Sequence, residues 1–165
     1  MRRNFTRILV PTDFGAPSDA ALDLAKTMAA TSGASLHLLH VLEDPFMTSV
    51  FATEFQALPP ADLREKWLER ARTWLNEQLT PAEQASFRST ELVVPGPPAQ
   101  TIVDYAKAND IDLIVMGTHG RRGVKHLLMG SVAERVVRAA ACPVLTVRDH
   151  GDVRTVTPAT TSAVV

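Results

Sequence analysis

The stretch DLIVMGTHGRRGVKHLLMGSVAERVV, residues 112–137, joins an apolar run to a helical run through a long basic loop. The apolar run is typical of a buried β-strand, and the residues from Ser131 onward have helical spacing. Gly117, Gly120 and Gly130 punctuate the loop, separated by two residues and then by nine. A strand followed by a helix is the repeating unit of a parallel α/β sheet, so the rest of the chain is expected to repeat it.

The same alternation of apolar runs and helical patterns runs along the chain. Strands are predicted at Arg7–Pro11, Ser35–Leu42, Ser89–Pro95, Asp112–Gly117 and Pro143–Val147. Helices are predicted at Ala16–Gly33, from Pro59 through Leu75, in a short capped turn from Thr80, at Pro97–Ile111 and at Ser131–Ala141.

Two details of these helices are specific enough to check. Ser18 or Asp19 is expected to cap the first helix, and Gly33 to end it. The second helix carries one apolar stripe, made of Leu63, Trp67, Ala71, Trp74 and Leu75.

This alternation predicts an α/β fold: a single-domain, three-layer α/β/α sandwich around one five-stranded parallel sheet. Right-handed crossovers favour the strand order 3-2-1-4-5. Ligands bind such sheets at the carboxyl ends of the strands, where the winding reverses. Here the reversal lies between the ends of the first and fourth strands, so Pro11, Thr12 and Asp13 should face the glycine loop. The domain is expected to span residues 1–148, and residues 149–165 to form a disordered tail.

Composition excludes several classes of protein. The 165 residues are 45% hydrophobic and 21% charged, with a formal net charge of −1, which gives no reason to expect nucleic-acid or membrane binding. No apolar run approaches the roughly 18 residues of a membrane span. The apolar run near the start is too short for a signal-peptide core, and the single Cys142 forms no internal disulfide, so we expect a cytoplasmic protein.

The glycine loop has the features of a phosphate-binding segment. Glycine lets backbone approach a ligand closely and can take positive φ, which turns amides toward an anion. Gly130 and Ser131 lie where the loop enters a helix, whose first amides and partial positive charge favour phosphate. Gly117 and Gly120 lie at the strand end, where a ribose or the first phosphate is expected.

Plainer interpretations of the same residues stay open. His119, Arg121 and Arg122, together with Lys125 and His126, would supply charge or contacts to a polyanion, or form a solvated surface. Ser131 with Glu134 fits a capping box, so Ser131 could simply cap its helix.

The spacing Gly-x2-Gly-x9-Gly-[Ser/Thr], matched at Gly117, Gly120, Gly130 and Ser131, resembles the ATP-binding signature of the universal stress protein family. ILVPTDFG, LHLLHVLE and CPVLTVR resemble that family's first, second and last strands. The resemblance covers residues 7–148. It implies an adenine nucleotide alpha hydrolase-like, Rossmann-like fold that binds ATP, or ADP or AMP.

The resemblance also implies roles for residues around the nucleoside. Asp13, beside Pro11 and Thr12, would contact the ribose or the base edge; the alternative is an aspartate that caps a turn. Val41, near the end of the second strand, would meet the adenine; the alternative is plain core packing.

On the other side of the nucleotide, Met116 and Gly117 would line the ribose, with core packing again the alternative for Met116. Gly120 would lie against the phosphates. The far end of the phosphate chain would be held by Gly130, Ser131 and Val132.

A binding module is favoured over an enzyme, because no residue pair supplies a base and a nucleophile and no Walker lysine is present. Mg²⁺ or Mn²⁺ bridging the phosphates is plausible, with Asp13 acting through water, but no metal site built from side chains is predicted. His37 and His40 should face opposite sides of their strand.

Two alternative functions stay open beside a nucleotide-dependent regulator with an unknown protein partner. One is a slow ATP hydrolase or self-phosphorylating protein, with Ser131 or Thr118 accepting phosphate. The other is an interaction scaffold with a vestigial pocket.

Strand Val144–Val147 has no charge or proline to discourage edge pairing, which predicts a homodimer, as the resemblance also implies. Phe46, Phe51 and Phe55 could cover the adenine side, meet a partner or pack on the second helix.

Overall fold

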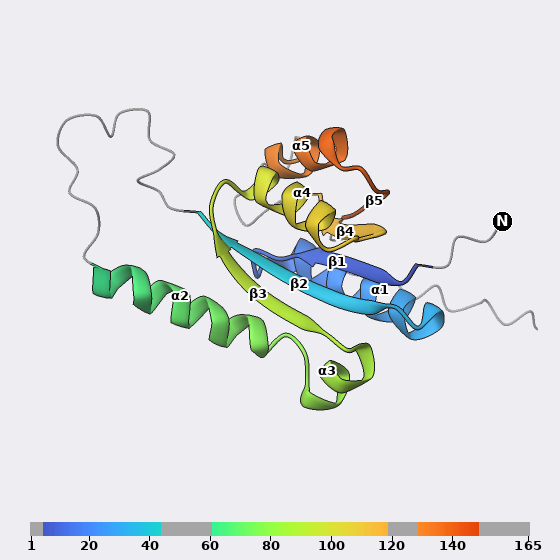
Figure 1. Ribbon diagram of the computed structural model, residues 1–165, viewed down its shortest axis with the longest axis horizontal. Coiled ribbons are helices and arrows are strands. Elements are labelled where there is room, and N and C mark those ends of the chain that lie inside the picture. Colours follow the sequence, from blue (N-terminus) through green and yellow to red (C-terminus); the bar gives the residue numbers. More distant parts are fainter. Residues whose placement is uncertain (1–4, 44–60, 119–128, 149–165) are drawn as a thin grey trace, which may run out of the picture.

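The computed structural model describes residues 5–43, 61–118 and 129–148, and their centre is a five-stranded, all-parallel sheet (Figure 1). Its strand order, β3-β2-β1-β4-β5, confirms the predicted order. The strands are β1 (Arg7–Pro11), β2 (Ser35–Leu42), β3 (Thr90–Pro95), β4 (Leu113–Gly117) and β5 (Val144–Val147).

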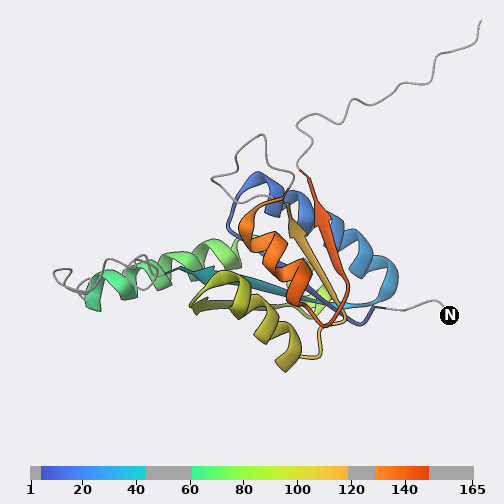
Figure 2. The ribbon, with the colours of Figure 1, turned by 90° about the horizontal axis from the view of Figure 1, so that it is seen from above.

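Helices cover both faces of the sheet, as the three-layer prediction requires. They are α1 (Ala16–Ser32), α2 (Ala61–Asn76), α3 (Pro81–Phe87), α4 (Pro98–Ala108) and α5 (Ser131–Ala139). Helices α1 and α2 pack on one face; α4 and α5 pack together on the other (Figures 1 and 2).

The alternation of side chains along each strand explains these two layers. Ile8 and Val10 of β1 belong to the apolar cluster under α1 and α2, whereas Leu9 belongs to the cluster under α4 and α5. In β4, Leu113 and Val115 belong to the cluster under α1 and α2, whereas Ile114 and Met116 belong to the cluster under α4 and α5. Because both faces are covered, the middle residues of β1 and β4 are all apolar, and the three β1 residues are fully buried.

The first helix begins at Ala16, where the sequence predicts it, but its cap differs from the prediction. Its N-cap is Gly15, so Ser18 and Asp19 lie inside the first turn rather than capping it. The Ser18 hydroxyl accepts a hydrogen bond from the Gly15 amide at 3.2 Å and donates to the Gly15 carbonyl at 2.8 Å, which replaces a side chain at the cap. At the other end Gly33 takes φ 72°, confirming it as the stop.

The capping box predicted from Thr80 is formed at the start of α3. The Glu83 amide donates to the Thr80 hydroxyl at 3.2 Å, and the Glu83 carboxylate accepts from the Thr80 amide at 2.8 Å. Lys26 of α1 lies 3.0 Å from the same carboxylate. The bond from the Thr80 backbone, followed by the one from Lys26, lowers the pKa of Glu83 to about 2.

The apolar stripe predicted for α2 faces the sheet only in part. Ala71 and Leu75 are buried, but Leu63 is 39% exposed and Trp74 is 37% exposed. The amino-terminal part of α2 extends past the strands (Figure 1). The Arg70 guanidinium lies 4.7 Å from the centre of the Trp74 ring and covers part of it instead.

Some predictions fall outside the described residues. These are the tail at 149–165 and the phenylalanines at 46, 51 and 55. Within the described residues, no helix is long and apolar enough to cross a membrane.

Candidate functional site

Strands β1 and β4 are parallel neighbours, with Ile8 opposite Leu113 and Leu9 opposite Ile114. Both strands therefore end at the same edge of the sheet. This edge is the winding reversal, where the chain leaves β1 toward α1 and leaves β4 toward α5. The two segments that the sequence assigns to the site, residues 11–13 and 116–118, are thus brought to one place.

A dense hydrogen-bond network fixes the β1–α1 turn, residues 12–15. The Thr12 amide donates to the Leu39 carbonyl at 2.9 Å and continues the ladder between β1 and β2. The Gly15 amide donates to Asp13 Oδ1 at 3.2 Å, so Asp13, which is half-buried, caps its own turn. Capping the turn was the alternative role for Asp13. The same carboxylate can still contact a ligand in this geometry.

His40 supports the turn from the neighbouring strand. Its Nδ1 lies 2.8 Å from the Thr12 carbonyl oxygen, and since a carbonyl only accepts, this nitrogen carries the proton. The His40 ring also packs against Phe14, with centroids 4.5 Å apart and the ring planes tilted by 36°. Sequence reasoning missed both partners, because no local pattern marks a contact between residues 26 or 28 positions apart.

Gly117 is a glycine because of packing between β4 and α1. A Cβ built on it would lie 2.8 Å from both the carbonyl carbon and the Cβ of Pro17, at the start of α1. Its φ is not positive, so the predicted need for unusual backbone freedom does not hold here. The missing side chain instead lets the first turn of α1 approach the strand end.

The two ends of the glycine loop meet. The Gly130 amide donates to the Thr118 carbonyl at 2.7 Å, and the Thr118 amide donates to the Val147 carbonyl of β5 at 2.8 Å. The entrance to α5 is therefore tied directly to the end of β4. As a consequence, the Gly130 amide is already hydrogen-bonded, and the backbone amides that could bind an anion are those of the residues that follow Gly130.

Those donors belong to the first turn of α5. Gly130, with φ −73° and ψ 156°, is the N-cap, in a conformation open to any residue. The amides of Ser131, Val132 and Ala133 follow it, and an α-helix offers no carbonyl to amides at these positions. They make a local concentration of positive partial charge at the end of β4.

The capping box suggested for Ser131 and Glu134 is wrong. Ser131 is the first helical residue rather than the cap, and its side chain is exposed. The Glu134 carboxylate turns instead to Arg138, one helical turn on, at 2.8 Å. The Ser131 hydroxyl is therefore not used as a cap.

An apolar wall lies beside these donors. Met116 is buried, and Val41, Val132 and Met129 are half-buried in the same cluster, on the α4 and α5 face of the sheet. Val41 and Met116, which were assigned to the adenine and the ribose, thus belong to one cluster with Val132, which was assigned to the far end of the phosphates. Their packing role is evident from this cluster as well.

The basic part of the predicted site lies outside the described residues. This applies to His119, Gly120, Arg121 and Arg122, and also to Lys125 and His126. His37 and His40 do face opposite sides of the sheet: His37 Nδ1 is 2.9 Å from the Tyr105 hydroxyl of α4, whereas His40 packs on the α1 side. Among the described residues no group of three acidic, histidine or cysteine side chains could hold a metal ion.

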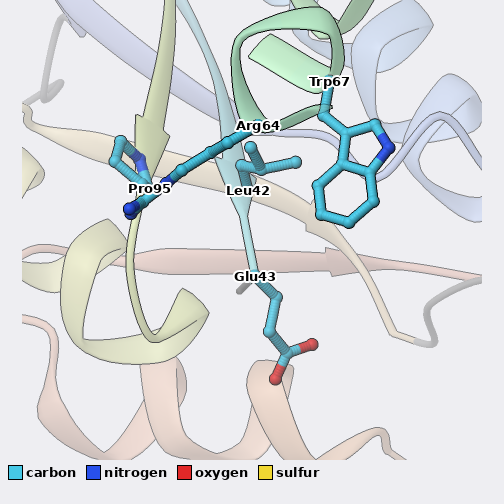
Figure 3. A pocket seen from close by; sticks show the side chains of 5 residues that line it. All are labelled: Leu42, Glu43, Arg64, Trp67 and Pro95. Atoms are coloured by element: carbon cyan, nitrogen blue, oxygen red, sulfur yellow. The ribbon is translucent and has the colours of Figure 1, made fainter. Parts of the chain in front are cut away.

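A small recess lies away from the reversal point. Leu42, Glu43 and Pro95 at the ends of β2 and β3 form it together with Arg64 and Trp67 of α2 (Figure 3). It encloses only about 10 Å³, far below the roughly 300–1,000 Å³ of typical small-molecule sites. We therefore do not assign the nucleotide to it.

Comparison with known proteins identifies the family. The universal stress protein family matches residues 4–148, nearly the whole of the part that folds into the sheet and its helices. The chain belongs to the universal stress protein family. Universal stress protein A homolog 2 of Coxiella burnetii is 34% identical to it over 150 residues, which cover 90% of this chain and 98% of the relative.

Solved structures of the family have the same fold. The structure of protein MJ0577, from Methanocaldococcus jannaschii, matches this universal stress protein with a TM-score of 0.76 at 30% identity, covering 90% of this chain and 99% of its own. More distant structures are one universal stress protein in complex with cAMP (24% identical, TM-score 0.63) and one from Archaeoglobus fulgidus in complex with dAMP (21%, 0.55).

Proposed function

We propose that this universal stress protein binds an adenine nucleotide, ATP, ADP or AMP, at the reversal point and acts as a nucleotide-dependent regulatory module. The observation that carries the proposal is the 2.7 Å bond between the Gly130 amide and the Thr118 carbonyl. It sets the first-turn amides of α5 at the end of β4, beside the β1–α1 turn. Anions bind where such amides gather at a helix start.

Two further observations support an adenine nucleotide as the ligand. The chain carries the whole spacing Gly-x2-Gly-x9-Gly-Ser, which resembles the family's ATP-binding signature, and two structures of the family hold cAMP and dAMP. The apolar side chains of Val41 and Met116 suit the nucleoside, because a purine is flat and largely apolar on its faces.

The nucleotide would lie across the reversal point. Pro11, Thr12 and Asp13 would contact the nucleoside, and the phosphates would run toward Ser131 and the loop. Mg²⁺ or Mn²⁺ would neutralise the phosphate chain from the solvent side, with Asp13 reaching it through water.

Titration calorimetry with Mg·ATP, ADP and AMP tests the proposal, together with mass spectrometry of small molecules released from the freshly purified protein. The informative variant is Gly130→Val, because a branched side chain at the cap stands over the first-turn amides. Val accommodates φ −73° and ψ 156°, so the nucleotide-free protein should lose only about 1 kcal/mol, the cost of a poorer cap.

We expect the wild-type protein to bind ATP and Gly130→Val to lose that binding while staying folded. No ATP binding by the wild-type protein at millimolar nucleotide would reject the proposal and favour a scaffold with a vestigial pocket. If Gly130→Val bound ATP as tightly as the wild-type protein, the nucleotide site would not lie at the start of α5.

The alternative to a binding module is an enzyme that uses the same site for catalysis, and the same purified protein can distinguish the two. Of the two hydroxyls considered as phosphate acceptors, Thr118 is only 4% exposed, whereas Ser131 is exposed. Prolonged incubation with labelled ATP distinguishes the cases: stoichiometric, intact nucleotide supports a binding module, and continuous phosphate release supports a hydrolase. Label retained on Ser131 would support self-phosphorylation.

We further propose that the protein acts as a homodimer joined through the strand Val144–Val147. This strand, β5, is an edge of the sheet. Leu145 on it is 37% exposed, and Val137 on the adjacent α5 is 44% exposed, so apolar surface accompanies the open edge. Sedimentation equilibrium should give twice the chain mass for the wild-type protein and the chain mass for Leu145→Lys.

A further inference from the structure

Phe14 has an unusual backbone for its residue type. Its φ of 59° is left-handed, a region that bulky side chains rarely take outside strained sites. Among the described residues only Arg88 and Asp110 share a positive φ without being glycine. Arg88 is the C-cap of α3, and Asp110 follows the C-cap of α4, where the left-handed conformation is common. Phe14 instead lies in the β1–α1 turn, next to Asp13.

Contacts from three sides hold Phe14 in this conformation. Its amide donates to the Thr12 hydroxyl at 3.0 Å. Its ring packs in a tilted arrangement against His40 of β2, with centroids 4.5 Å apart, and edge-to-face with Trp74 of α2, with centroids 5.6 Å apart. The clamp, His40–Phe14–Trp74, therefore fixes the ring between a strand and a helix that are far from it in sequence.

The conformation of Phe14 sets the position of the Asp13 carboxylate. Residues 13 and 15 flank Phe14, and the Gly15 amide reaches back to Asp13 Oδ1 at 3.2 Å only because the chain turns sharply between them. His40 adds to this, since its Nδ1 holds the Thr12 carbonyl at 2.8 Å on the other side of Asp13. If Phe14 relaxed to negative φ, the Asp13 side chain would lose its anchor on Gly15.

We propose that Phe14 is a positioning residue: its ring, held between His40 and Trp74, keeps the backbone left-handed and so aims the Asp13 carboxylate at the nucleoside of the bound nucleotide. This inference rests on the proposed nucleotide-binding function. It also makes α2 part of the site's support, because Trp74, which contacts the Phe14 ring, belongs to α2.

The test is a double-mutant cycle on ATP affinity with Phe14→Ala and Asp13→Ala, measured by calorimetry. Phe14→Ala removes the clamp but keeps a Cβ that disfavours φ 59°, so the turn should relax. We expect the Kd for ATP to rise about tenfold in Phe14→Ala. In the Asp13→Ala background the same change should alter the Kd by less than about twofold, because the group being aimed is gone.

Two further variants separate positioning from packing. Phe87→Ala is the matched control, because Phe87 is a half-buried phenylalanine on the same apolar cluster but lies on α3, outside the turn. It should lower the thermal midpoint and leave the Kd unchanged. Phe14→Gly removes the same ring but tolerates positive φ, so its Kd should rise less than that of Phe14→Ala; it also serves if Phe14→Ala fails to fold.

The outcomes distinguish a failure of this inference from a failure of the proposed nucleotide-binding function. If the wild-type protein binds ATP and Phe14→Ala binds it equally well, Phe14 positions nothing and the proposed function stands. If the Phe14→Ala and Asp13→Ala losses multiply fully, the role of Phe14 is general packing, and the inference is overturned. If the wild-type protein binds no adenine nucleotide, both proposals fall together.

Discussion

Replacing Gly117 by alanine tests whether this glycine is required by the architecture of the protein, independently of any ligand. An added Cβ would lie 2.8 Å from the carbonyl carbon of Pro17, 2.8 Å from its Cβ and 3.0 Å from its carbonyl oxygen. Two of these atoms are backbone, and the third belongs to a rigid ring, so none can rotate away. Relief requires the first turn of α1 to move off the end of β4.

The expected cost follows from comparison with a second glycine. Overpacking of this kind costs about 1–3 kcal/mol, and the rigid neighbours place Gly117→Ala toward the upper part of that range. Gly33→Ala is the control: its φ is 72°, but nothing lies within 4 Å of the added Cβ, so only a conformational cost of about 1–2 kcal/mol applies. In both variants, loss of freedom in the unfolded chain offsets about 0.4–1 kcal/mol.

Urea unfolding of the nucleotide-free protein measures the difference. We expect a net loss of about 2 kcal/mol for Gly117→Ala and about 1 kcal/mol for Gly33→Ala. The loss for Gly117→Ala corresponds to a fall of roughly 4–8 °C in thermal midpoint. A Gly117→Ala protein as stable as the wild type would refute the reasoning. It would mean that α1 yields at no cost and that glycine at 117 serves only a ligand.

Two predictions concern the pH dependence of stability. The pKa of Glu83 falls from 4.5 to about 2 on folding, so its stabilising effect is complete above about pH 5 and is lost as the pH falls toward 2. The thermal midpoint of Glu83→Gln should therefore lie below that of the wild type at pH 7, and the two midpoints should converge near pH 2. A difference between the midpoints that stays constant with pH would contradict this. Burial, followed by the charge of Arg7, lowers the pKa of His37 below 6.5, so the folded protein favours neutral His37 and loses stability as the pH drops through and below 6.5. Denaturant unfolding of His37→Gln at pH 7.5 and 5.5 should show a smaller decline than the wild type, and an equal decline would assign the effect to other groups.

Much of the candidate site was predictable because its signals are local. The spacing of Gly117, Gly120 and Gly130 is visible along the chain, and the strand order follows from alternation and crossover handedness. Together these place the ends of β1 and β4 at one edge, as the structure confirms. The reasons for the glycines were not predictable: Gly117 faces Pro17, and Gly130 bonds Thr118, neither with positive φ.

The sequence by itself determined the α/β class, the order of the five strands and the edge of the sheet where the glycine loop begins, because periodicity and glycine spacing act over a few neighbouring residues. Only the tertiary structure decided that Gly15 rather than Ser18 starts α1, that Glu134 pairs with Arg138 rather than capping α5, and that Phe14 is clamped by His40 and Trp74. Cap positions and side-chain partners differ by small free energies among local alternatives, and contacts between distant segments select one of them.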